Sequence, residues 1–298
     1  MSPSLPHHHR APSGETQPNG ANQWDHIIAP HGGWFDLHLE AVWEYWDLLW
    51  LFVRRDIVSY YKQTILGPVW LVIQPIFTTL IYVLVFGKIA KLSTDGAPQV
   101  VFYMCGIAFW NYFADCLTKT SNVFRDNAGL FGKVYFPRLV VPISIIISNL
   151  VRFSIQFTLF LAIWVYYVAI GEVQPNWAIA LFPVLLATMA AIGLGSGLLF
   201  SAVTTKYRDM AFLLQFGVQL LMYATPVIYP ASQIPNEIAN VLKWNPLAPI
   251  IETARYGLLG TGSLSWYGLV YSMAFAGILL LASAAVFNKV ERTFMDTV

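Results

Sequence analysis

The segment GLFGKV at residues 129–134 has the residue types of a phosphate-binding loop but not their spacing. Such a loop needs four residues between its glycines and a Ser or Thr after the lysine, so that backbone amides can wrap a phosphate. Here two residues separate the glycines, and Val134 follows Lys133. The sequence also contains no HExxH, GxSxG, DxD or CxxC motif. We therefore predict no catalytic residues and no nucleotide site in this chain.

The cysteines, histidines and acidic residues lack the spacing that catalysis or metal binding requires. Cys105 and Cys116 lie eleven residues apart, which on a helix is about 16 Å. That separation is too large for a disulfide, so we expect two packed thiols. The histidine run at 7–9 is short and terminal, and we predict no metal site. A glycan-processing enzyme would need clustered acids or histidines, whereas the carboxylates of the predicted outer loops are scattered: Asp95, Glu172, Glu237 and Glu252.

The composition indicates a membrane protein. Of the 298 residues, 57% are hydrophobic and 11% are charged, and the mean hydropathy is +0.57. Soluble domains carry about a quarter charged residues, so this chain could not cover its own surface in water, and lipid must solvate much of it. The net charge of +1 provides no strong field for nucleic acid, and we expect no nucleic-acid partner.

Six hydrophobic segments have about the 20 residues that a bilayer core requires. They lie at about 69–87, 100–121, 140–170, 177–203, 211–229 and 266–288. Six spans place both termini on one side of the membrane. Of the 17 Lys and Arg residues, twelve then lie on the side of the termini, four lie on the opposite side, and Arg152 lies within a span. By the positive-inside rule, both termini are predicted to be cytoplasmic.

We divide the chain into a tail, an interface helix and a transmembrane domain. Residues 1–30 are rich in Pro, Ser, Asn and Gly, and they are predicted to be disordered. Residues 31–62 contain an amphipathic helix over 34–53, whose carboxylates oppose an apolar face and whose tryptophans suit the headgroup zone. We expect this helix to lie in the membrane interface. Residues 63–298 form the six-span domain, and the fold class is an all-α polytopic membrane protein.

Two connections between the spans are unusual. The outer segment 230–265 is half apolar and contains four prolines, which favours short helices that re-enter the membrane under a cover of protein or water. The inner loop 122–139 mixes charged residues with apolar ones, including Phe124, Phe131 and Phe136. A solvated loop would not need that apolar surface. We therefore expect a short amphipathic helix that docks into a groove of another protein.

Polar residues recur at helical spacing within the spans. Polar groups are costly in hydrocarbon, so these residues should face protein or water. Arg152, which shares a stripe with Asn149 and Gln156, needs a buried partner or a path to the interface. For the glutamine-containing stripes, helix–helix hydrogen bonding and pore lining are equally good explanations. The candidate channel-lining residues, which include aromatic planes for a sliding sugar ring, are Trp70, Gln74, Phe77, Gln215, Gln219 and Tyr223.

Four motifs occur in the order found in one family of transporters. With the amphipathic segment before them, they resemble the membrane subunit of type-two ABC exporters for polysaccharides. The nearest likeness is to O-antigen exporter permeases, and capsule and teichoic-acid permeases are near relatives. The resemblance covers about 34–292 and leaves out the tail. The motifs are YYKQTILGPVWLVIQP at 60–75, FRDNAGLFGKVYFPRLVVP at 124–142, KYRDM at 206–210, and TPVIYP at 225–230 followed by WNPLAPIIETAR at 244–255.

The resemblance implies a half-transporter of the bacterial cytoplasmic membrane. Two copies of the chain would form the channel, and two copies of a separate ATPase subunit, which holds ATP and Mg, would drive it. No cofactor is expected in this chain itself. The loop between spans two and three matches the family's coupling helix, and about 230–240 and 246–260 match its gating helices. By matching motif, the residues expected to meet the ATPase are Arg125, Asp126, Asn127, Leu130, Lys133, Tyr135, Tyr207 and Arg208.

The same resemblance implies a glycan linked to polyprenyl pyrophosphate as the substrate. Arg54, Arg55 and Lys62 stand where the interface helix should turn into the first span, and guanidinium groups suit phosphates. We hypothesise that they receive the pyrophosphate at a lateral gate. Anchoring to anionic membrane lipid explains the same residues slightly better. For the chain as a whole, the alternatives are a permease for capsule polysaccharide, teichoic acid, a small lipid or a drug, and more remotely a glycan-processing enzyme.

Overall fold

All regular structure in the described part of the chain is helical. The computed structural model describes residues 43–62, 67–131, 133, 136–235, 237 and 242–295. The predicted tail and residues 34–42 of the predicted interface helix lie outside this part. The helices are α2 (Trp46–Tyr61), η1 (Gly67–Val69), α3 (Trp70–Tyr82), η2 (Val83–Ile89), α4 (Gln99–Ser121), α5 (Val123–Asp126), α6 (Ala128–Phe131), α7 (Val140–Ala169), η3 (Trp177–Leu181), α8 (Phe182–Lys206), α9 (Met210–Tyr223), η4 (Ala231–Gln233), α11 (Ala248–Leu259) and α12 (Trp266–Met295).

The described residues contain five helices that are long and apolar enough to cross a membrane. The predicted fifth span is represented by α9, which is apolar but has only 14 residues. The hydropathy pattern therefore predicted the other five spans, and it overestimated the length of this one. The five candidate spans are Trp70–Ile89, Gln99–Ser121, Val140–Ala169, Trp177–Lys206 and Trp266–Phe287.

α9 ends before the predicted span is complete. The prediction ran to residue 229, but residues 224–229 form turns and bends. Pro226 has no backbone N–H to donate and disfavours a helical conformation in the residue before it, which stops the helix. Asn245, from the later connection, donates to the Ala224 carbonyl at 3.0 Å. A distant side chain thus satisfies a carbonyl that the end of the helix leaves unpaired.

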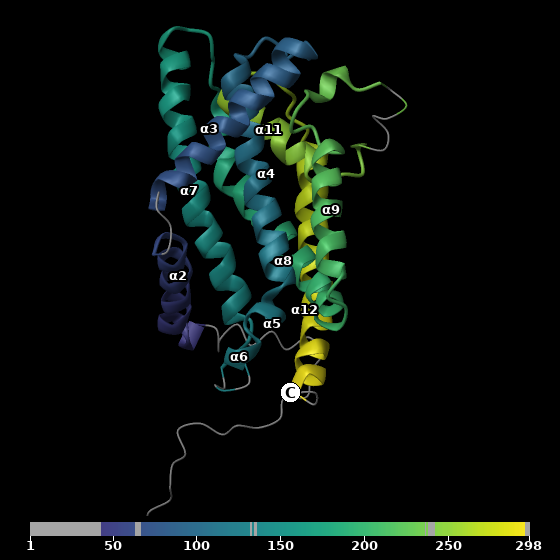
Figure 1. Ribbon diagram of the computed structural model, residues 1–298. Coiled ribbons are helices and arrows are strands. Elements are labelled where there is room, and N and C mark those ends of the chain that lie inside the picture. The colour runs from purple at the N-terminus through teal and green to yellow at the C-terminus, as the bar shows by residue number, and fades with distance from the viewer. Residues whose placement is uncertain are drawn as a thin grey trace, which may run out of the picture. The chain divides into compact units, whose positions relative to one another are not determined.

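α4 is the central helix of the bundle. It packs mainly against α8 and α7 and also contacts α3, α9 and α11, and Figure 1 shows it between α7 and α9. Two glycines allow α8 to approach it closely. A Cβ at Gly193 would stand 2.8 Å from the Cβ of Cys116, and one at Gly197 would stand 2.5 Å from the Cβ of Thr120. The glycine pair thus allows close packing of the two helices, as small-residue spacing in membrane helices predicts.

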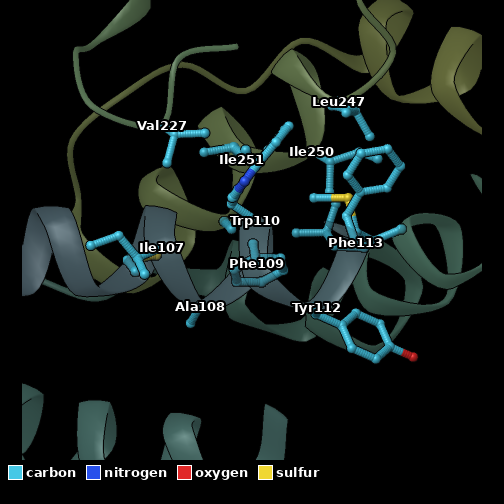
Figure 2. Close-up of a cluster of buried hydrophobic side chains, with 14 of the residues drawn as sticks. Ile107, Ala108, Phe109, Trp110, Tyr112, Phe113, Val227, Leu247, Ile250 and Ile251 are labelled. Atoms are coloured by element: carbon cyan, nitrogen blue, oxygen red, sulfur yellow. The ribbon is translucent and has the colours of Figure 1, made fainter. Parts of the chain in front are cut away.

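A large apolar core lies toward the end of the bundle that carries α11, which we call the α11 end. Side chains of α4, among them Phe109 and Trp110, meet α11 and the turn at Val227 (Figure 2). The two cysteines on α4 are buried, unbridged thiols, as predicted. This core fixes α11 and the turn before it to the central helix.

A second apolar cluster lies at the other end of the bundle, which carries α5 and α6 and which we call the α6 end. There α2 packs its apolar face against α7. α2 continues to Tyr61, so Arg54 and Arg55 lie within the helix and not at its end, where the sequence had placed them. The chain bends later, at Gly67, whose φ of +51° lies in the left-handed region that favours glycine.

Candidate functional site

The connection between α4 and α7 folds back onto the chain itself. Its helices α5 and α6 have four residues each. Phe124, Phe131 and Phe136 are buried in the cluster that α2 and α7 also form, and Phe124 stacks on Phe287 of α12 with ring centroids 4.9 Å apart. The prediction that these phenylalanines dock into another protein was therefore wrong. Their apolar surface belongs to the chain's own core.

The polar residues of the same connection form its exposed face. Arg125 and Asp126 are exposed and pair at 3.1 Å, and Lys133 is also exposed. Asn127 and Leu130 are half-buried. Tyr135, the remaining predicted coupling residue here, lies outside the described residues. The structure thus places the charged members of the predicted coupling set on the surface of the α6 end.

Arg55 of α2 reaches this exposed face. Its Nη2 donates to Oδ1 of Asn127 at 3.5 Å and lies 2.9 Å from Oδ1 of Asp56. Its guanidinium also lies over the Phe52 ring, 4.9 Å from the centroid. Arg54 is exposed on the same helix. Two residues that the sequence assigned to different sites, Arg55 to the lateral gate and Asn127 to the coupling contact, therefore touch, whereas Lys62 is exposed at the end of α2.

The segment after α8 lies at the same end of the bundle. α8 contacts α5, and the Thr204 hydroxyl donates to the Ser121 carbonyl at the end of α4. Tyr207 and Arg208 follow α8 and are exposed, and the Lys206 ammonium lies 5.2 Å from the centroid of the Tyr207 ring. The structure thus brings the two predicted coupling residues of KYRDM to the end that carries α5 and α6.

The predicted channel-lining residues are exposed in the single chain. They lie on two helices that touch through Tyr82 of α3, whose hydroxyl donates to Sδ of Met222 on α9 at 3.7 Å. The chain's own packing therefore leaves both stripes uncovered. The exposed residues are Trp70, Gln74 and Phe77 on α3, and Gln215, Gln219 and Tyr223 on α9.

A polar cluster joins α4 to α7. Nζ of Lys119 lies 3.4 Å from Oδ2 of Asp115 and donates to Oδ1 of Asn149 at 2.9 Å. Nη1 of Arg152 donates to the same Asn149 oxygen at 3.4 Å and lies 4.0 Å from Oδ2 of Asp115. Arg152 thus has the partner that its position in a span required. Sequence reasoning missed Asp115 and counted Lys119 only among the cations on the side of the termini, although their spacing on one helix face was a readable signal.

Arg255 of α11 fastens the connection that follows α9. Its side chain is 1% exposed and lies 3.4 Å from Oε1 of Glu252. Its guanidinium donates to the carbonyls of Pro226 at 2.7 Å and Val227 at 2.5 Å, and it lies over the Phe102 ring, 3.7 Å from the centroid. Burial raises the pKa of the Glu252 carboxyl, and the adjacent guanidinium opposes that shift. One side chain therefore joins the TPVIYP and ETAR motifs, although the sequence had indicated only an outer-side cation.

The arrangement of charges suits binding and packing. Across the residues that the structure describes, no group of three or more His, Cys, Asp or Glu side chains is placed to hold a metal ion. The charged side chains of the helices instead form mixed clusters of cations, carboxylates and amides. Such clusters can hold helices together or bind an anion.

The chain matches the ABC-2 type transporter family over residues 47–259, from α2 to the end of α11. It is 27% identical over 255 residues to the O-antigen export system permease protein RfbA of Klebsiella pneumoniae, covering 84% of this chain and 94% of that protein. It is 26% identical over 262 residues to RfbA of Myxococcus xanthus, covering 87% and 98%. It is also 24% identical over 251 residues to the polysialic acid transport protein KpsM of Escherichia coli, covering 82% and 93%. Because the family match spans well over half of its length, this chain belongs to the ABC-2 type transporter family.

Proposed function

We propose that this chain is the channel-forming permease subunit of an ABC transporter that exports a lipid-linked polysaccharide of the O-antigen type. The observation that carries the proposal is the similarity, along 84% and 87% of the chain, to two permeases named for O-antigen export. The similarity to a polysialic acid transport protein supports capsule polysaccharide as the alternative cargo. In this proposal the chain is a transport subunit that holds no nucleotide site and performs no covalent chemistry.

Six passages through the bacterial cytoplasmic membrane, with both termini in the cytoplasm, are the arrangement that we propose. α9 and the turns after it would form the fifth passage. A turn at membrane depth is tolerated when protein satisfies its backbone, and here Arg255 binds the carbonyls of Pro226 and Val227. α11 has 12 residues, which is too short to cross a bilayer and suits a re-entrant gating helix. The amphipathic helix that includes α2 would lie in the inner interface.

A separate ATPase would bind at the α6 end and supply the energy. Two ATPase subunits, each holding ATP and Mg, would contact the surface made by Arg125, Asp126, Lys133, Tyr207 and Arg208. Asn127, Leu130 and Tyr135 complete the proposed contact. The phenylalanines below this surface pack with α2, α7 and α12 in one cluster. A push on α5 and α6 would therefore reach three longer helices directly, because close-packed cores transmit strain.

Two copies of the chain would enclose the channel. The uncovered stripes of α3 and α9 are the surfaces that we propose line it, with Trp70 and Phe77 as planes for sugar rings. Arg54, Arg55 and Lys62 remain the proposed entrance for a pyrophosphate beside the first span. The contact between Arg55 and Asn127 gives Arg55 a second proposed role. It would couple pyrophosphate binding at the entrance to the surface that contacts the ATPase.

Deletion of the gene in its native host tests the function. We expect a surface polysaccharide to disappear and its lipid-linked form to accumulate on the cytoplasmic side. The wild-type gene should restore export, and it should fail to do so when the partner ATPase lacks its phosphate-loop lysine. The sugar composition of the trapped glycan distinguishes O-antigen from capsule polysaccharide or teichoic acid.

The alternative functions give different results in the same strain. A permease for a small lipid or drug would leave the surface polysaccharide unchanged, and this outcome would contradict the proposal. A glycan-processing enzyme would leave a polysaccharide of altered structure on the surface instead of a trapped one of normal structure.

A further inference from the structure

We propose that the polar cluster of α4 and α7, formed by Asp115, Lys119, Asn149 and Arg152, binds the pyrophosphate headgroup of a lipid-linked cargo inside the membrane. The inference rests on the proposed function, because a lipid-linked cargo is what would bring such a headgroup into a channel. The cluster is distinct from the basic residues of α2, since it lies on two other helices.

The cluster lies within two candidate membrane spans. Asp115 and Lys119 belong to the candidate span Gln99–Ser121, and Asn149 and Arg152 belong to the candidate span Val140–Ala169. Ionisable side chains within spans are costly, and they mark ligand or ion pathways unless the fold alone requires them. Asp115 lies less than two turns from the end of α4, so a headgroup entering from that side reaches it without crossing the bilayer.

The rest of the chain leaves one face of α4 uncovered. α4 is buried over most of its surface, and 78% of its most apolar stretch is buried. A face that met only lipid tails would be apolar, but this one is largely polar, so it borders water or a polar ligand. From residue 111 to the end of the helix, the positions that the chain leaves unburied are Asn111, Ala114, Asp115, Thr118 and Lys119.

The charges and the central amide favour an anion. The cluster holds two cations and one carboxylate. Oδ1 of Asn149 accepts from Lys119 and from Arg152, while its Nδ2 lies 3.7 Å from Sγ of Cys116. Asn149 is buried, and these contacts at both ends of its amide hold its oxygen toward the two cations. This arrangement keeps an ammonium and a guanidinium side by side, where they can bind neighbouring oxygens of one phosphate group.

The cluster is partly exposed in the single chain. The side chains of Lys119 and Asp115 are 36% and 47% exposed, and that of Arg152 is 17% exposed. A lysine ammonium has three N–H donors, and Asp115 and Asn149 accept two of those of Lys119. The third can bind a ligand oxygen. Lys119 is therefore the residue on which binding should depend most.

Binding of farnesyl pyrophosphate to the permease–ATPase complex in nanodiscs of phosphatidylcholine tests the site. Lys119→Gln should weaken binding by about tenfold or more, because it removes the positive charge, whereas Lys119→Arg, which keeps the charge, should retain most of the wild-type affinity. Asp115→Asn should tighten binding several-fold, because it removes the negative charge beside the cations. A misfolded protein cannot produce that gain. Lys88→Gln, the same substitution at an exposed lysine of η2 outside the cluster, should bind like the wild type.

Competition identifies what the site recognises. Farnesol, which lacks the phosphates, should fail to displace the probe, and inorganic pyrophosphate should displace it weakly. If inorganic pyrophosphate displaced it as well as farnesyl pyrophosphate does, the site would take a soluble anion and the lipid assignment would be overturned. Displacement by phosphatidylglycerol at an equal molar ratio would likewise overturn it in favour of ordinary membrane lipid.

The outcomes separate this inference from the proposed function. If Lys119→Gln and Asp115→Asn both bind the probe like the wild type, the cluster only joins two helices and the inference fails. Export by the wild-type gene is scored independently in the deletion strain. If export is restored while the variants bind normally, the function stands without this site. If the wild type restores no export, the function fails whatever the probe does.

Discussion

The two ends of α4 each meet an arginine from another helix, and the two arginines are held in opposite ways. Near the α11 end, Arg255 lies over Phe102 and is 1% exposed, with backbone carbonyls and Glu252 around it. Near the α6 end, Arg152 lies beside Asp115 in a cluster whose lysine and aspartate are partly exposed. The cluster around Arg255 is closed, because the chain itself buries it. The cluster around Arg152 is open, because the chain leaves two of its members partly exposed.

The difference separates charges that hold the fold from charges that can serve a ligand. A buried cation surrounded by acceptors cannot be removed without leaving those acceptors unpaired, so it is needed for stability. An open cluster loses less when one member is replaced, because water or lipid headgroups can substitute. We therefore expect substitutions in the closed cluster to reduce stability, and substitutions in the open cluster to change ligand binding with little effect on stability.

Replacement of Arg255 should have the largest effect on stability. Arg255→Leu leaves Glu252 and the carbonyls of Pro226 and Val227 without their partner, and we expect a loss of about 3–5 kcal/mol. Thermal unfolding of the detergent-solubilised protein, followed by size-exclusion chromatography, measures it. Lys88→Leu serves as the exposed control, and Lys119→Gln should cost less than about 1 kcal/mol. Equal melting of Arg255→Leu and the wild type would remove the distinction between the clusters.

Adding a side chain at a glycine of α8 should have the next largest effect on stability, because the added atoms would push α8 away from α4. At Gly197 a Cβ would stand 2.5 Å from that of Thr120, so Gly197→Val should cost about 1–3 kcal/mol by overpacking. Gly277→Val is the matched control, since nothing lies within 4 Å of a Cβ there. If both variants melt alike in the same assay, α8 does not hold α4 as closely as described.

Arg55 offers a third case, an exposed arginine whose partner is a predicted coupling residue. Arg55→Ala and Asn127→Ala should leave melting nearly unchanged and lower ATP hydrolysis by the complex a few-fold. If their 3.5 Å hydrogen bond carries the effect, the double variant should be no worse than either single one, with a coupling energy of about 0.5–1 kcal/mol. Fully additive losses would show that the two residues act separately.

Local pattern predicted the parts of this fold that depend on local properties. The length and hydropathy of a span are set by the bilayer, so five spans were found from the sequence. The glycine spacing on α8 is likewise a local pattern, of the kind that accompanies close helix packing. Hydropathy could not locate the end of α9, because a scale of apolarity does not register that Pro226 breaks a helix, and because the Asn245 side chain that binds the helix end comes from a distant part of the chain.

The remaining errors concern which surfaces meet. Phe124, Phe131 and Phe136 have the amphipathic pattern of a docking helix, and pattern alone cannot tell a partner protein from the chain's own α2 and α7. Asp115 and Lys119 acquire meaning only when α7 brings Asn149 and Arg152 beside them. Both cases depend on contacts between residues far apart in the sequence, which periodicity along one helix does not contain.

The smallest expected effect tests whether a surface contact helps Arg255 to hold the α11 end of the bundle together. The Ser232 hydroxyl lies 2.8 Å from both carboxylate oxygens of Asp95, which links the loop before α4 to the segment after α9. Both residues are exposed, so Ser232→Ala should change stability by less than about 1 kcal/mol. Hydrogen exchange should become faster at 230–235 and stay unchanged in α11, because Arg255 fastens α11 independently. Faster exchange throughout α11 would mean that the surface link, and not the buried arginine alone, keeps this end of the bundle closed.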